Sequence, residues 1–217
     1  MPPADDPGHA PAPSLSIPEI RDYQRINAEL KVLLDQGHRR VRLEGAEGQR
    51  LLVAGLAGPW SAVVEVEGRT GPEFAANLDA PGLVVVAQGP TADGAARGLR
   101  SGVVIVLGPA DDAAGAAQAG GTLIIAGPVG HRVGLGQSGG SLVLLGPTGR
   151  LPGERQAGGT LYFRPGNLGP HAGRGRRGGR RVEILGEGSV EVGAPVGWGD
   201  LVAIAAPWLD LSASPRS

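Results

Sequence analysis

The sequence contains no cysteine and few aromatic residues. Aromatic residues make up 3% of the 217 residues. The absence of cysteine excludes disulfides, thiolate nucleophiles and cysteine-ligated iron–sulfur or zinc sites within this chain. The scarcity of aromatic residues indicates an aliphatic core, and a hydrophobic content of 41% is enough to bury one as a single domain with tails.

A long apolar run and an excess of charge of one sign are also missing. No apolar run reaches the ~18 residues of a membrane-spanning helix, and the N-terminus lacks the basic and apolar parts of a secretory leader. We therefore expect a cytoplasmic protein without membrane contact. The formal net charge of −1 argues against a chain built throughout to hold nucleic acid.

Residues 82–163 repeat one short pattern five times. Each repeat has a glycine, a short aliphatic run, a second glycine and a glycine-rich return. A fixed period with one short strand per repeat is typical of stacked solenoids. We predict a mainly β fold, a single-stranded right-handed parallel β-helix with an N-terminal capping α-helix. The repeats begin at Gly82, Gly102, Gly121, Gly140 and Gly159, so that most coils contain 19 residues.

Stacking places equivalent residues of successive coils above one another, and side chains alternate faces along each strand. Two rows should therefore point inward and form the core, and a third should point outward. Because the third row is also apolar, another wall of the chain or a partner protein should cover it. The inward rows are Val104, Leu123, Leu142 and Leu161, and Val106, Ile125, Leu144 and Phe163; the outward row is Val85, Ile105, Ile124, Val143 and Tyr162.

The rest of the chain divides into distinct segments. Proline-rich residues 1–15 predict a disordered leader. Residues 16–37 have helical apolar spacing, and Ser16 and Glu19 have capping-box spacing, which predicts one amphipathic helix that caps the solenoid or docks a separate subunit. The solenoid domain covers 38–170 and is entered through strand-like runs at 41–43, 51–53 and 62–66. An Arg/Gly-rich loop at 171–181 and strands at 182–185, 189–192 and 201–205, within a C-terminal segment 182–217, complete the chain.

Two segments resemble a known family. YQRINAEL (23–30) and VRLEGAEGQRLLVAGL (41–56), followed by the glycine-rich coils, resemble the GXGXG domain over residues 20–165. This domain forms the C-terminal part of the large glutamate synthase subunit and occurs in archaeal-type glutamate synthase and N-methylglutamate synthase subunits. The glycine-repeat subunit of formylmethanofuran dehydrogenase is related and has a similar repeat.

The resemblance implies a structural β-helix that packs against catalytic domains binding FMN, iron–sulfur clusters or glutamine. The flavin-binding and amidotransferase portions are absent here, so partner chains would complete any reaction. Several glycines usual in the returns are also replaced, as in ADDAAGAAQAG at 110–120.

Candidate sites for chemistry within the chain are weak. GLGQSG (134–139) has dinucleotide-fingerprint spacing, but a predicted strand follows it and not the helix that would hold a pyrophosphate. Asp111 and Asp112 are adjacent and would point to opposite sides, a poor acid–base pair. No histidine has a second ligand at metal-binding spacing. We expect no catalytic residue, cofactor or metal in this chain. The histidines are His9, His38, His131 and His171.

The strongest local charge lies in HAGRGRRGGRR (171–181). Guanidinium groups bind phosphate, RNA or acidic protein surfaces. No aromatic residue is interleaved to stack bases, which disfavours nucleic acid. A solvated loop, a contact for an acidic partner and a nucleic-acid or phosphate site all stay open. The arginines are Arg174, Arg176, Arg177, Arg180 and Arg181.

These observations predict a noncatalytic structural subunit of a multi-subunit glutamate-synthase-like complex. In this hetero-oligomer the chain would position catalytic subunits that carry FMN or iron–sulfur clusters, and could line an ammonia passage. Two alternatives stay open. One is a component like the glycine-repeat subunit of a formylmethanofuran dehydrogenase or formyltransferase/hydrolase complex, and the other is a module whose arginine-rich loop binds RNA or an acidic protein.

Overall fold

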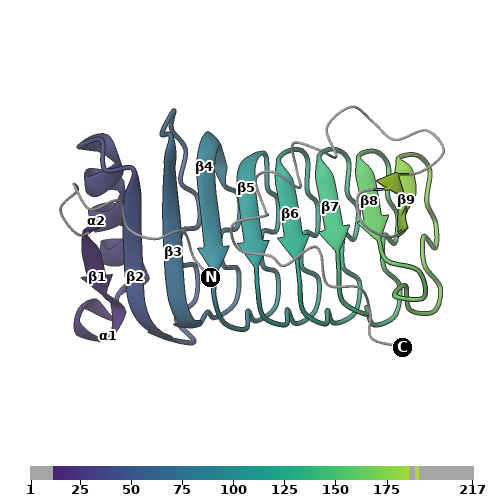
Figure 1. The fold of residues 1–217 in the computed structure, drawn as a ribbon, viewed down its shortest axis with the longest axis horizontal. Helices are drawn as coiled ribbons and strands as arrows, with labels where there is room; N and C mark the ends of the chain where they lie inside the picture. Colours follow the sequence, from purple (N-terminus) through teal and green to yellow (C-terminus); the bar gives the residue numbers. More distant parts are fainter. Residues whose placement is uncertain (1–11, 186–188, 191–217) are drawn as a thin grey trace.

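The computed structural model describes residues 12–185 and 189–190. Two short helices follow the first strand and lie beside the β1 end of a long sheet (Figure 1). The helices are α1 (Ile17–Ile20) and α2 (Tyr23–Asp35). The strands are β1 (Ser14–Ser16), β2 (Arg40–Glu47), β3 (Ala62–Arg69), β4 (Asp79–Ala87), β5 (Ser101–Val106), β6 (Thr122–Ile125), β7 (Ser141–Leu144), β8 (Thr160–Phe163), β9 (Arg180–Leu185) and β10 (Ser189–Val190).

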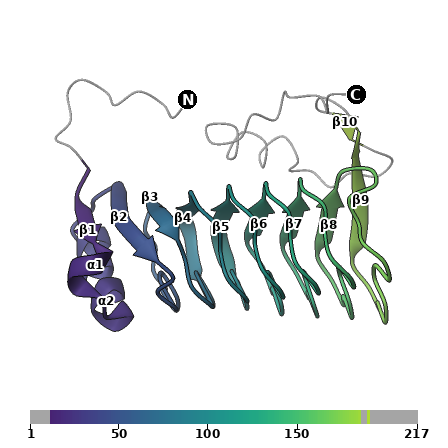
Figure 2. The ribbon, with the colours of Figure 1, turned by 90° about the horizontal axis from the view of Figure 1, so that it is seen from below.

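The sheet has a solenoid topology. The strands stand in chain order from β1 to β10, each pair from β1 to β9 is parallel, and β10 is antiparallel to β9. Each parallel strand is joined to the next by a return on one side of the sheet (Figure 2). The predicted mainly β solenoid is confirmed. Backbone hydrogen bonds also link the returns, as between Ala113 N and His131 O (2.8 Å), so the coils are bonded around their circumference.

The two predicted inward rows lie inside the coils. Val104, Leu123, Leu142 and Leu161 stand in register and are fully buried. In the second row Phe163 is only partly buried, because it stands near the C-terminal end of the stack.

The predicted outward row needs one correction. Val86, and not Val85, pairs with Ile105, while Val85 pairs with Val104 and belongs to the core. The register shifts between Asp79 and Val84, so the extra residue of the first repeat is accommodated at the start of β4 and the later strand positions keep the regular offset. The corrected row is buried, as the sequence predicts for an apolar outward row.

The N-terminal cap contains two helices and not the predicted single helix. Asp22 caps α2 by accepting a hydrogen bond from Gln24 N (3.0 Å), whereas Ser16 makes no side-chain capping bond. Asp22 is extended and Arg21 has a φ of 60°, so the helix is interrupted between Ile20 and Tyr23. Strand β1 also occupies the end of the predicted leader, whose first 11 residues lie outside the described part.

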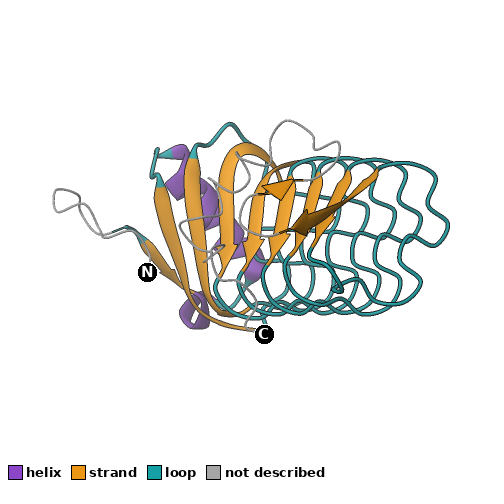
Figure 3. Ribbon diagram, turned by 45° about the vertical axis from the view of Figure 1, so that its right-hand side comes forward, coloured by secondary structure: helices purple, strands orange, loops and turns teal. Residues whose placement is uncertain are grey.

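The returns have a similar shape from coil to coil (Figure 3) and share an unusual backbone conformation. Three alternate residues of each return have positive φ, as at Arg132, Gly134 and Gly136 (58°, 67° and 65°). The same triplet occurs in seven successive returns, at 51/53/55, 73/75/77, 94/96/98, 113/115/117, 132/134/136, 151/153/155 and 171/173/175. Residues 51–53, predicted as a strand, therefore form a corner. GLGQSG is likewise a corner followed by β7.

Candidate functional site

The arginine-rich segment is the last regular return of the solenoid. His171, Gly173 and Gly175 have positive φ like the corners before them. Arg155 N donates to Arg174 O and Arg177 N donates to Gln156 O, both at 2.8 Å. The segment 171–181, predicted as an Arg/Gly-rich loop, therefore continues the pattern of the returns, and backbone bonds to the preceding coil hold it in place.

The two core rows end in charged residues on β9. Arg181 pairs with Leu161 and Glu183 pairs with Phe163, and both charged residues are exposed. Because β9 is the last parallel strand, aliphatic residues at these positions would face water. The Arg181 guanidinium lies against Gly173, where an added Cβ would stand 3.1 Å from Cζ. Arg181 thus ends the core, a role for which its charge is suited.

Arg176 also has a structural role. In the last coil it makes the hydrogen bonds to backbone carbonyls that a row of buried glutamines makes in the preceding coils. Gln137 is 1% exposed, and its Nε2 donates to Gly139 O (3.1 Å) and Gly140 O (3.3 Å). Arg176 makes the same two bonds in the last coil, from Nε to Gly178 O (2.8 Å) and from Nη2 to Gly179 O (2.5 Å). Our sequence-based predictions missed this row, although its 19-residue spacing is visible. The glutamines are Gln118, Gln137 and Gln156.

Three of the five predicted arginines remain available for a partner. Arg174, Arg177 and Arg180 are exposed, and no carboxylate of the described residues lies within ion-pair distance of them. The last ion pair along the described chain is Arg132–Glu154 (3.4 Å). We call these three arginines the basic rung. Residues 164–183 contain six arginines and one glutamate, a formal charge of +5 in a chain of net charge −1.

The side chains at another corner position bind the backbone of the next coil. Asp112 N donates to Asp93 Oδ1 (3.0 Å), His131 N donates to Asp112 Oδ1 (2.7 Å), and Arg150 N donates to His131 Nδ1 (2.9 Å). The predicted charged turn at Asp111 and Asp112 therefore contributes a structural contact. His131 likewise uses one ring nitrogen to tie two coils together.

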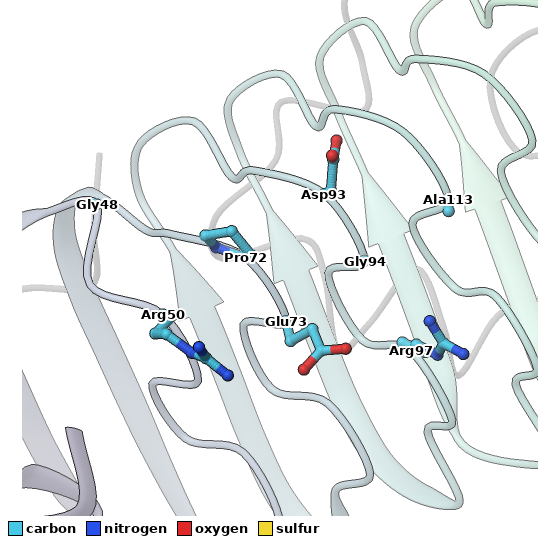
Figure 4. A pocket seen from close by; sticks show the side chains of 8 residues that line it. All are labelled: Gly48, Arg50, Pro72, Glu73, Asp93, Gly94, Arg97 and Ala113. Carbon is cyan, nitrogen blue, oxygen red and sulfur yellow. The ribbon is translucent and has the colours of Figure 1, made fainter.

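A charged depression lies over the first returns (Figure 4). Its volume is about 550 Å³. Two arginines and two carboxylates are among its lining residues, and Figure 4 shows the Glu73 side chain between those of Arg50 and Arg97. Because its charges balance, this surface favours neither an anion nor a cation. It lies at the opposite end of the solenoid from the basic rung. The lining residues are Gly48, Arg50, Pro72, Glu73, Asp93, Gly94, Arg97 and Ala113.

The helical cap has a small apolar depression on its surface. Helix α2 buries Ile26, Leu30 and Leu34 in the solenoid core, as expected of a cap. Val32 faces outward and is 53% exposed. It lines a depression of about 360 Å³ together with Leu15 and Leu33 among others. Docking of a separate subunit on this helix stays a prediction.

The described residues contain no group of three or more histidine, aspartate or glutamate side chains that could hold a metal ion. His38 and His171 lie exposed and apart, and His9 is outside the described part. Within the described ranges we also find no helix with the length and hydrophobicity needed to cross a membrane.

Comparisons with known proteins identify no relative. No protein-family model, no curated protein and no solved structure matches this chain. The fold and the site therefore define a class, the parallel β-solenoid with an exposed basic terminal rung. Any finer assignment is a proposal.

Proposed function

We propose that this chain is a noncatalytic β-solenoid subunit of a glutamate-synthase-like complex, in which it holds catalytic subunits in position. The basic rung would contact an acidic surface of one such partner. One observation carries the proposal: Arg174, Arg177 and Arg180 project from a single coil and have no carboxylate partner among the described residues. The resemblance of residues 20–165 to the GXGXG domain supports the choice of complex.

The construction of the solenoid suits a positioning role. Every coil is bonded to its neighbours through strands and returns, and the inner rows are fully buried except at Phe163. Such a stack presents its terminal coil as a rigid platform, because moving one coil would break bonds on all sides. Since side chains fill the coil interior, an ammonia passage could not run through the solenoid. It would run along the outer side of the returns, between this subunit and a partner.

The chemistry of the basic rung favours an acidic protein surface over nucleic acid. Guanidinium groups bind carboxylates with two parallel hydrogen bonds, and a rigid set of them can match a fixed acidic surface. Nucleic-acid surfaces usually add aromatic residues that stack on bases, and residues 164–183 contain no aromatic residue. The formyl-transfer complex would use the same kind of interface but different catalytic subunits.

Affinity purification of the tagged chain from its native cells tests the proposal. We expect stoichiometric recovery of a flavin- or iron–sulfur-containing subunit, and glutamine-dependent glutamate formation by the complex but not by this chain alone. Glutamate formation by the isolated chain would overturn the noncatalytic role. Recovery of a metal-dependent amidohydrolase-like subunit would favour the formyl-transfer alternative, and recovery of no subunit would overturn a scaffolding role.

A charge-reversal variant tests the basic rung in the recovered complex. The substitutions Arg174→Glu, Arg177→Glu and Arg180→Glu together should abolish co-purification. The matched control carries Arg69→Glu, Arg100→Glu and Arg150→Glu, which change the same charge at exposed arginines elsewhere. Equal recovery of the partner with both variants would exclude the basic rung as the contact. Tight binding of the unmodified chain to a mixed-sequence RNA, lost in the first variant, would favour the RNA-binding alternative.

A further inference from the structure

The outward side of the sheet carries a second buried apolar cluster. Its central row contributes one residue from each of the strands β4 to β9. Ile105 is 0% exposed and Val143 is 2% exposed, which is burial of the kind found in a protein interior. We call this row and its partly buried neighbours Val103 and Leu145 the outer face. The row is Val86, Ile105, Ile124, Val143, Tyr162 and Val182.

The described elements do not explain this burial. The returns lie on the opposite side of the sheet, and both helices lie at its β1 end (Figure 2). A sheet buries both of its faces only when a second layer packs on each. The outer face therefore requires a covering layer.

We propose that the outer face binds residues 201–209 of the same chain. Residues 191–217 lie outside the described part, so their sequence and the end of the described chain carry the proposal. The segment LVAIAAPWL (201–209) has no charged residue and includes Trp208. Val190 on β10 pairs with Ile184 on β9, which brings the chain to the C-terminal edge of the outer face.

The dimensions of the segment and the face agree. Six strands at a spacing of about 4.8 Å span roughly 24 Å, and nine extended residues reach about 30 Å. Residues 191–200 supply a connection from β10. At the other end the central row becomes charged, since it continues as Glu65 on β3 and Arg42 on β2. The apolar area thus ends within the distance that the segment can cover.

This inference is separate from the proposed function and limits where partners bind. An outer face closed by the chain's own C-terminal segment leaves the returns and the ends of the solenoid, including the basic rung, as the places for partner subunits. An apolar surface of this size exposed to water would also promote association between copies.

Thiol cross-linking of the full chain tests the proposal, because the chain contains no cysteine of its own. Val103→Cys on the outer face and Ala205→Cys in the segment should be joined within one chain by a short bifunctional reagent. The matched control pairs Ala205→Cys with Ala119→Cys, an exposed position on a return, and should stay unlinked. Links found only between chains would overturn the proposal in favour of a second copy as the cover.

Binding of an apolar dye provides a second measurement. Ile204→Asp together with Trp208→Asp in the full chain should expose the outer face and increase the fluorescence of anilinonaphthalene sulfonate several-fold, with unchanged far-ultraviolet circular dichroism. Unchanged dye fluorescence, with no link between positions 103 and 205, would overturn the proposal. If the double variant failed to fold, the cross-linking result would decide, since its substitutions leave the segment apolar.

Discussion

The side-chain amide of Asn27 on helix α2 fixes the backbone of Val53 in the first return. Val53 N donates to Asn27 Oδ1, and Asn27 Nδ2 donates to Leu51 O, both at 2.8 Å. Val53 and Leu51 have φ values of 61° and 58°, which β-branched and bulky residues rarely adopt. Asn27 thus joins helix α2 to the first return, and it holds the first corner in a strained conformation.

Replacing Asn27 should destabilise the cap. Asn27→Ala leaves the partly buried Val53 N without an acceptor and removes one of the two donors to Leu51 O, which also accepts from Ala54 N (3.2 Å). We therefore expect a loss of about 2 kcal/mol in the free energy of unfolding. Asn27→Asp keeps the acceptor for Val53 N but places a carboxylate oxygen near Leu51 O, and should lose at least as much. Chemical denaturation measures both. Gln24→Ala, an exposed change on the same helix, is the control, and equal effects of Asn27→Ala and Gln24→Ala would contradict this role.

Ala117 and Gly136 occupy the same corner position in neighbouring coils, with φ values of 57° and 65°. Only a glycine adopts this conformation without strain, and no atom lies within 4 Å of an added Cβ at Gly136. Ala117→Gly should therefore stabilise the protein and Gly136→Ala should destabilise it, each by about 1 kcal/mol in thermal or denaturant unfolding. Ala119→Gly, at an exposed position without positive φ, should not stabilise. A loss of stability with Ala117→Gly would refute the explanation.

The sequence predicts the solenoid well because its strongest signal is periodic. The rows through Leu123 and Leu142 follow from a repeat of 19 residues and the alternation of side chains, and neither depends on details of the turns. The exchange of Val85 for Val86 shows the limit of this reasoning. A single extra residue can be accommodated before or inside a strand, and the spacing of glycines does not reveal which.

The roles of the arginines could not be predicted from their clustering. Arg181 continues the row of Leu161, and Arg176 continues the row of Gln156. Only the register of the last coil shows that these two arginines have structural roles and that Arg174, Arg177 and Arg180 do not. The helix break at Asp22 was missed for a related reason. The helical spacing of apolar residues runs through 16–37 without a gap, so it does not reveal that α1 starts after Ser16 and α2 starts anew after Asp22.

Acid should weaken the N-terminal cap through Asp35. Lys31 Nζ lies 2.6 Å from Asp35 Oδ2 and Trp60 Nε1 donates to Asp35 Oδ1 (2.9 Å). These hydrogen bonds, first that of Lys31 and then that of Trp60, lower the pKa of Asp35 below its ordinary value of 3.8. The lowered pKa means that folding favours the carboxylate, so this contribution to stability is present above pH 3.8 and is lost as the pH falls through the folded-state pKa.

Denaturant unfolding of wild type and Asp35→Asn at pH 6 and pH 3 measures this contribution. The variant should be less stable than wild type at pH 6, and the difference should shrink at pH 3, because the carboxyl group of the unfolded wild-type chain then takes up a proton while that of the folded chain resists it. Glu29→Gln, which removes the exposed Arg25–Glu29 ion pair of the same helix, controls for general loss of helix charge. A difference that grows on acidification would contradict the predicted sign.

Arg176 should be replaceable by the residue that its row carries in earlier coils. Gln156 donates from Nε2 to Gly159 O (3.4 Å), and Gln137 makes two such bonds, so Arg176→Gln can reach the carbonyls of Gly178 and Gly179. We expect Arg176→Gln to change the free energy of unfolding by less than about 0.5 kcal/mol and Arg176→Leu to reduce it by about 1 kcal/mol, because leucine leaves the two carbonyl groups to water alone. Both variants remove one positive charge from the end of the solenoid. Since Arg176 is bonded to its own coil and is not part of the basic rung, Arg176→Gln should also leave recovery of the partner subunit unchanged, whereas loss of the partner would extend the interface to this residue.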